Sequence, residues 1–118
     1  MILILFSHNM ITRIVKLSFK DTEVANFLSF FDQTKEAVVQ FPGCRGMKLL
    51  NDQNSPCIFF TYSQWESEEA LENYRNSDLF KIIWPRLKIG FNQRAEAWTC
   101  KVNFESYISD FQSNQSII

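Results

Sequence analysis

The segment 57–65 carries large apolar side chains on both of its faces, and this feature limits the fold more than any other. Its residues alternate between two sets, which are Phe59, Thr61, Ser63 and Trp65 on one face and Ile58, Phe60, Tyr62 and Gln64 on the other. Alternation over this length predicts a strand. A strand that is apolar on both faces is covered on both. We therefore expect helices on one face and a further layer on the other.

The other patterned segments predict two helices and three more strands. Period-two alternation marks the strands, and apolar residues three and four positions apart mark the helices. The expected elements are a strand at 11–20, a helix from 21 to 41, strands at 44–50 and 57–65 joined by a polar turn, a helix from 67 interrupted at 76–78, and a strand at 95–104. The first helix is expected to turn Val24, Phe27, Leu28, Phe31, the stem of Lys35, and Val38 inward. We expect Pro85 to kink the later helix near 81–84.

The resulting order, β-α-β-β-α-β, is the split βαβ arrangement of ferredoxin-like α+β folds. It predicts an antiparallel sheet with both helices on one side. We expect the domain at 10–104, an N-terminal extension at 1–9 and a polar C-terminal tail at 105–118. The simplest cover for the bare sheet face is a second copy of the same sheet, so we predict a homodimer through that face. The tail contains Tyr107, Ile108 and Phe111, which could dock on the partner subunit.

Charge and hydropathy exclude several classes of function. The chain has 12 basic and 13 acidic residues, with a formal net charge of -1, so it lacks the positive field of a nucleic-acid binder. The apolar run at 1–6 is too short for a transmembrane helix and lacks the basic start and cleavage site of a signal peptide. We therefore expect a cytoplasmic protein without a membrane or nucleic-acid partner.

Few residues are suited to metal binding or to histidine chemistry. His8 is the single histidine, and the three cysteines, Cys44, Cys57 and Cys100, are widely spaced. This argues against a zinc site, a disulfide framework and a Ser-His-Asp triad, so we expect no metal. By contrast, 12 Phe, 3 Tyr and 3 Trp exceed what a small core needs. We expect the function to use an apolar cavity or an apolar interface.

Three short blocks of sequence are similar to blocks of a known family. They are Phe41-Pro42-Gly43-Cys44, the block from Tyr62 to Leu71 (YSQWESEEAL), and Ser77-Asp78-Leu79-Phe80-Lys81. They resemble the antibiotic biosynthesis monooxygenase family of dimeric α+β barrel proteins, over roughly residues 10–104. The second block is specific for the fold family and weakly specific for one activity. Members of this family include cofactor-free oxygenases of quinols and aromatic polyketides, haem-degrading monooxygenases, signal-processing isomerases and many uncharacterised proteins.

The resemblance argues against haem degradation. The haem-degrading branch uses an asparagine on the first strand, a tryptophan at the end of the third strand and a histidine in the second helix region. Trp65 matches the tryptophan. No asparagine occurs between Ile11 and Lys20, and Trp84 occupies the position expected for the histidine. We therefore expect no cofactor.

Cofactor-free oxygenation requires a pocket, removal of a proton and stabilisation of an oxyanion, because a phenol or quinol itself supplies electrons to oxygen. The candidates for the substrate pocket are Trp65, Trp84, Phe31, Phe80, Tyr62 and Tyr74. Indole N–H groups are candidate donors to a substrate oxygen. The sequence does not identify the base, so the catalytic residues are unassigned. Arg13 and Arg45 are either partners of an anionic substrate or solvated residues at strand edges.

Two hypotheses follow. The first is a cofactor-independent monooxygenase that acts on a small aromatic or quinol-like molecule in an apolar pocket. The second is a non-catalytic, small-molecule-binding or stress-associated dimer, in which Trp65 and Trp84 are packing residues and the tyrosine hydroxyls face solvent. The acidic run 66–72 has a structural explanation as well, because carboxylates are stabilised in the first turn of a helix.

Overall fold

The computed structural model describes residues 9–111. Its elements are β1 (Ile11–Ser18), the short 3-10 helix η1 (Asp21–Glu23), α2 (Val24–Val39), β2 (Cys44–Asn51), β3 (Ile58–Trp65), α3 (Glu68–Arg75), α4 (Asp78–Ile89) and β4 (Glu96–Lys101). The predicted order of strands and helices is confirmed, with the second predicted helix divided into α3 and α4. Residues 1–8 of the expected N-terminal extension, including His8, and residues 112–118 of the expected tail lie outside the described residues.

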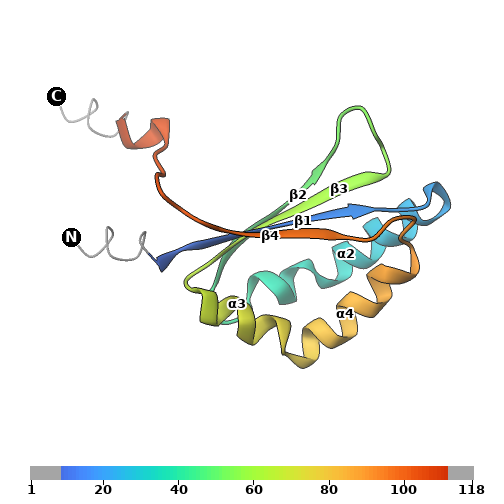
Figure 1. Ribbon diagram of the computed structural model, residues 1–118, viewed down its shortest axis with the longest axis horizontal. Coiled ribbons are helices and arrows are strands. Elements are labelled where there is room, and N and C mark those ends of the chain that lie inside the picture. Colours follow the sequence, from blue (N-terminus) through green and yellow to red (C-terminus); the bar gives the residue numbers. More distant parts are fainter. Residues whose placement is uncertain (1–8, 112–118) are drawn as a thin grey trace.

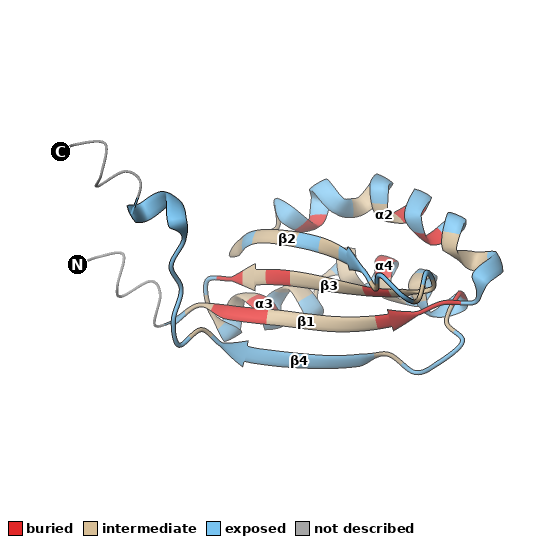
Figure 2. Ribbon diagram, turned by 90° about the horizontal axis from the view of Figure 1, so that it is seen from above, coloured by how far each residue is buried: buried red, intermediate tan, exposed pale blue. Residues whose placement is uncertain are grey.

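The four strands form one antiparallel sheet in the order β2-β3-β1-β4. Helices α2, α3 and α4 all lie against the same face of this sheet (Figure 1). Most of the buried strand residues lie on the central strands β1 and β3, whereas β4 is exposed along its whole length (Figure 2). This is the ferredoxin-like α+β fold that the order of elements predicts.

The strand register decides which side chains face the helices. Val15 of β1 lies opposite Thr61 of β3 and Ala97 of β4. Residues directly opposite each other point to the same face of a sheet. The odd-numbered residues of these three strands therefore face the helices, and the even-numbered residues face the open side.

The largest core cluster contains Leu17, Phe19, Phe27 and Phe59. The ring of Phe19 stacks on that of Phe27 with centroids 4.3 Å apart, and Phe27 meets Phe59 edge-on at 5.1 Å. A second cluster surrounds Trp65, the most deeply buried large side chain. These two clusters fix α2 and α3 on the sheet.

The predicted inward face of the first helix is wrong at one position. Leu28 is 42% exposed, whereas Phe30, which the spacing did not select, is 9% exposed. Phe30 packs with Val38 and with Ile83 of α4. Because α4 lies beside α2, the side of α2 that faces this neighbour is buried as well as the side that faces the sheet.

Gly43 joins α2 to β2 at a point where no other residue fits. Its φ of 90° lies in the left-handed region, and a Cβ there would be 2.4 Å from the Cβ of Ala70 in α3. Ala70 is held in place because its N–H donates to Oγ of Ser67, the N-cap of α3. Two of the blocks that suggested the family are therefore in direct contact.

The end of the last strand also differs from the prediction. β4 ends at Lys101 and does not extend to Phe104, because Lys101 pairs with Ile11, the first residue of β1. Beyond this point one backbone hydrogen bond, from the N–H of Val102 to the carbonyl oxygen of Met10 at 3.4 Å, continues the pairing outside the two strands. Helix α4 continues past Pro85 to Ile89, so the proline does not end it; the kink itself stays a prediction.

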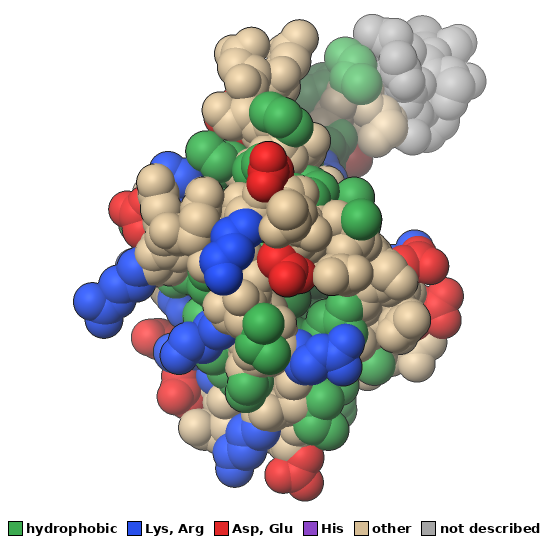
Figure 3. All heavy atoms as spheres, turned by 90° about the vertical axis from the view of Figure 1, so that its right-hand side faces the viewer, with side chains coloured by type: hydrophobic (Ala, Val, Ile, Leu, Met, Phe, Trp, Pro, Cys, Tyr) green, Lys and Arg blue, Asp and Glu red, His purple; other side chains and the backbone are tan. Residues whose placement is uncertain are grey.

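The open face of the sheet is partly apolar. Leu50 and Trp98 on this face are 45% and 46% exposed. The segment after β4 extends on the side of the sheet away from the helices (Figure 1), and it exposes large side chains, with Phe104 85% and Ile108 72% exposed. Figure 3 shows basic and acidic side chains interspersed at one end of the molecule. No helix among the described residues is long and apolar enough to cross a membrane.

Candidate functional site

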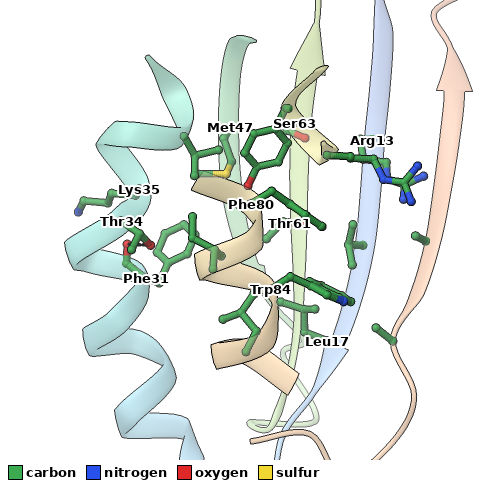
Figure 4. Close-up of a pocket in the computed structure, with 18 of the residues that line it drawn as sticks. Arg13, Leu17, Phe31, Thr34, Lys35, Met47, Thr61, Ser63, Phe80 and Trp84 are labelled. Carbon is green, nitrogen blue, oxygen red and sulfur yellow. Dashed lines mark hydrogen bonds between the residues drawn. The ribbon is translucent and has the colours of Figure 1, made fainter. Parts of the chain in front are cut away.

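A cavity of about 330 Å³ lies between the helices and the sheet. Its volume falls at the small end of the range for ligand pockets. The floor comes from β1, β3, β4 and Met47 of β2, and the walls come from α2, α3 and α4 (Figure 4). The aliphatic and aromatic lining residues are Val15, Leu17, Phe27, Phe31, Val38, Met47, Trp65, Leu71, Tyr74, Phe80, Ile83, Trp84, Leu87, Ala95 and Ala97. The polar lining residues are Arg13, Thr34, Lys35, Thr61, Ser63 and Arg75.

A continuous series of aromatic contacts forms one wall. Trp65 stacks on Tyr74 with ring centroids 5.0 Å apart, Tyr74 meets Phe80 edge-on at 5.3 Å, and Phe80 stacks on Trp84 at 5.8 Å. The spacing of Phe80 and Trp84 in α4 places them on one side of that helix, because residues four apart are neighbours. The wall favours a flat aromatic ligand, since stacked and edge-on ring pairs are both favourable.

The indole N–H of Trp65 is already engaged. Trp65 is 0% exposed, and its Nε1 donates a hydrogen bond to Oγ of Ser63 at 2.9 Å. The expectation that this N–H reaches a substrate oxygen is therefore wrong. Ser63 lines the cavity, and after accepting from Trp65 its hydroxyl proton is still available to a ligand.

Tyr74 is a neutral group at physiological pH. Burial raises its pKa to about 12, and the nearby Cys44 contributes to the rise. A phenol with such a pKa stays protonated at pH 7, so it acts as a hydrogen-bond donor and not as a general base. Burial also raises the pKa of Cys44 itself, which makes this thiol unreactive.

Two guanidinium groups line the cavity, one from near the start of β1 and one from the last residue of α3. Arg13 projects from β1, and its Nη1 donates to Oγ1 of Thr99 on β4 at 2.6 Å. Arg75 ends α3 and pairs with Glu72 at 3.4 Å. Desolvation by burial lowers the pKa of Arg13, the charge of Arg75 lowers it further, and Glu72 acts in the opposite direction.

The structure places five of the six pocket candidates around this cavity. They are Trp65, Trp84, Phe31, Phe80 and Tyr74. Tyr62 does not join them: it pairs with Ile14 and lies on the open face of the sheet, where Lys48 is 5.8 Å from its ring. Since residues 62 and 65 differ by an odd number, strand alternation already separates Tyr62 from Trp65.

The remaining candidates are also placed. Arg45 is exposed and pairs with Glu66 at 3.1 Å, outside the cavity. Thr61 and Ser63 were missed as lining residues, although the alternation of 59–65 places both on the face of Trp65. Arg75 was missed too, and no local pattern identifies it. Within residues 9–111, no group of three or more His, Cys, Asp or Glu side chains is placed to hold a metal ion.

Fold and site together define a ferredoxin-like α+β protein with an aromatic-walled cavity between its helices and its sheet. The sequence model of the antibiotic biosynthesis monooxygenase family matches residues 10–83. The chain therefore belongs to the antibiotic biosynthesis monooxygenase family, as the resemblance predicted. A comparison with curated protein sequences finds no significant match.

Solved structures share this fold at low sequence identity. A conserved protein from Methanosarcina mazei Go1 matches with a TM-score of 0.78 and 22% identity, over 83% of this chain and 97% of that chain. Rv0793 from Mycobacterium tuberculosis matches with a TM-score of 0.76 and 12% identity, over 83% and 99% of the two chains. A mutant of SnoaB, a cofactor-independent oxygenase from Streptomyces nogalater, matches with a TM-score of 0.74 and 15% identity, over 82% and 96%.

Proposed function

We propose that this protein is a cofactor-independent monooxygenase that oxidises a small aromatic or quinol-like substrate in the cavity between α4 and the sheet. The observation that carries the proposal is the series of aromatic contacts from Trp65 to Trp84, which lines the cavity together with the hydroxyls of Thr61 and Ser63. Membership of the family and the fold shared with a cofactor-independent oxygenase support it.

In this reaction the substrate supplies the electrons. A phenol loses a proton, its anion reduces O₂, and a new carbon–oxygen bond forms on the ring. One oxygen atom stays in the quinone product and the other leaves as water, so a phenol and O₂ give a quinone and H₂O. The hydroxyls of Ser63 and Tyr74 are the donors that stabilise negative charge on oxygen, and the apolar wall excludes water.

The test is oxygen uptake by purified, metal-free protein with a panel of hydroquinones, naphthohydroquinones and anthrones. We expect at least one substrate to consume O₂ well above its uncatalysed rate, with one O₂ consumed for each substrate molecule. An anthrone should give the anthraquinone and a hydroquinone the hydroxyquinone, each with one H₂O and without H₂O₂. Uptake at the uncatalysed rate across the whole panel would contradict the proposal.

One observation favours the second function, a non-catalytic small-molecule-binding protein. The described lining residues include no carboxylate and no imidazole, and Tyr74 is protonated at neutral pH. A base must therefore come from the solvent or from the substrate's own acidity. Ligand binding in the cavity without catalysed oxygen uptake would select this second function.

We further propose that two copies associate through the open sheet faces, with the segment after β4 packing on the partner. Support comes from the apolar residues on both faces of β3 and from exposed Leu50 and Trp98. Gln64 of β3 donates to Oε1 of Glu105 at 3.4 Å, so this segment crosses the end of the open face. Light scattering at micromolar concentration should give twice the monomer mass, and a chain truncated after residue 103 should dissociate more readily.

A further inference from the structure

Three cations line the cavity, and two of them, Arg13 and Arg75, share the nearby carboxylate of Glu72. Arg13 and Arg75 both line the cavity, and the charge of Arg75 lowers the pKa of Arg13. Glu72 pairs with Arg75, and its carboxylate balances one of the two charges. The third cation of the lining, Lys35, is neutralised by Asp32 at 2.6 Å.

Arg13 is unusual among the arginines because its guanidinium is partly desolvated. Within the part of the chain that the structure describes, its hydrogen-bond partner is the neutral hydroxyl of Thr99, which uses one of the five N–H donors of the group. The carboxylate that raises the pKa of Arg13, that of Glu72, is itself paired with Arg75, and the opposing effect of desolvation on Arg13 is larger. Arg45 offers the contrast, because it is exposed and pairs with the carboxylate of Glu66.

The surroundings of Arg13 fit the flat body of a ligand. Arg13 pairs with Thr99 across β1 and β4, and Val15 and Ala97 form the next pair on the same face of the sheet. These two small side chains supply a low floor to the cavity. Trp84 approaches this floor from α4 (Figure 4). An aromatic ring of a ligand between this floor and Trp84 would place one of its substituents at the end of the cavity where Arg13 lies.

We infer that the ligand of this cavity is a small aromatic carboxylate, whose ring lies against Trp84 and whose carboxylate pairs with Arg13 and Arg75. The inference rests on the proposed function, because it takes this cavity as the substrate site, and it adds the class of substrate. A guanidinium binds a carboxylate through two parallel hydrogen bonds, which gives orientation as well as affinity. The anion would also relieve the repulsion between the two arginines.

The probes are 2-naphthoate and its neutral isostere 2-naphthamide, with binding measured by calorimetry and by tryptophan fluorescence. We expect wild-type protein to bind the carboxylate at least tenfold more tightly than the amide. Arg13→Gln and Arg75→Gln should each lower the affinity for the carboxylate about tenfold and leave that for the amide unchanged. Arg45→Gln, which removes an exposed arginine with a single carboxylate partner, should change neither.

Arg13→Lys keeps the charge and should retain part of the preference, and thermal melts of each variant report whether it folds. Equal affinities of wild-type protein for the two probes would overturn this inference and leave the proposed function standing. The same loss in Arg45→Gln as in Arg13→Gln would also overturn it. If neither probe binds, the cavity is not an aromatic-binding site, and both the inference and the proposed function are contradicted.

Discussion

The indole Nε1 of Trp65 donates to Oγ of Ser63, two residues earlier on the same face of β3, at 2.9 Å. Removing the acceptor leaves a wholly buried N–H without a partner. We predict that Ser63→Ala lowers the free energy of unfolding by about 1–3 kcal/mol in chemical denaturation. Ser63→Thr keeps the hydroxyl and should cost less. An alanine variant as stable as wild type would show that the bond contributes nothing.

Tyr74 gives the stability of the protein a specific dependence on alkaline pH. Its pKa is about 12 in the folded protein, above the ordinary value of 10. The folded state therefore holds this proton more tightly, and the resulting stability is present below pH 10 and is lost as the pH rises towards 12. The loss amounts to about 2–3 kcal/mol for this group.

Tyr74→Phe measures that contribution, because it keeps the stacked ring and removes the ionisable hydroxyl. Unfolding free energies of the two proteins should run in parallel below pH 10 and converge or cross above it. Parallel curves throughout pH 10–12 would contradict a buried hydroxyl at this position.

The contact between Gly43 and Ala70 predicts a large effect of one methyl group. Gly43→Ala combines a left-handed φ of 90° with a Cβ contact of 2.4 Å, so we expect a loss of about 2–4 kcal/mol in the free energy of unfolding. Gly46→Ala is the matched control, since Gly46 also has a positive φ, of 154°, but nothing lies within 4 Å of its Cβ position. Gly46→Ala should lower the free energy of unfolding less than Gly43→Ala does. Equal losses in the two variants would mean that the contact with α3 is unimportant.

The proposed dimer predicts that a charge on the open face dissociates it. Trp98→Asp places a carboxylate on that face and should give a monomer in sedimentation experiments. Ile82→Asp is a suitable control, because Ile82 is 64% exposed on α4, on the opposite side of the sheet. Dissociation by both variants, or by neither, would contradict the open face as the interface.

Most of the fold could be predicted from local patterns. Alternation identified the strands, the three-four spacing identified the helices, and the turn at 51–56 identified the hairpin. The bounds of β4 could not be predicted, because its end at Lys101 depends on where β1 begins. The burial of Phe30 in place of Leu28 depends on the position of α4 beside α2, and no pattern within α2 encodes this.

The site could be predicted in its aromatic part and in one of its two arginines, because the sequence offered Arg13 as a candidate partner of an anionic substrate and did not offer Arg75. Trp65, Phe80 and Trp84 follow from strand and helix spacing. Tyr62 lies an odd number of residues from Trp65 in the same strand, so its side chain points to the other face of the sheet. This alternation was sufficient to exclude Tyr62 from the cavity. Arg13 of β1 and Arg75 at the end of α3 line the same cavity although they are distant in the sequence, and such long-range proximity leaves no local signal.

The central claim is that the cavity is the place of oxidation, and filling it tests that claim most directly. Ala97 lines the cavity and is exposed to solvent, so Ala97→Phe occupies the space without disturbing the buried core. Ala25→Phe is the control, an alanine exposed on α2 away from the cavity. Oxygen uptake with the best quinol should fall at least tenfold in Ala97→Phe and stay at the wild-type rate in Ala25→Phe. Undiminished uptake by a folded Ala97→Phe protein would contradict the claim.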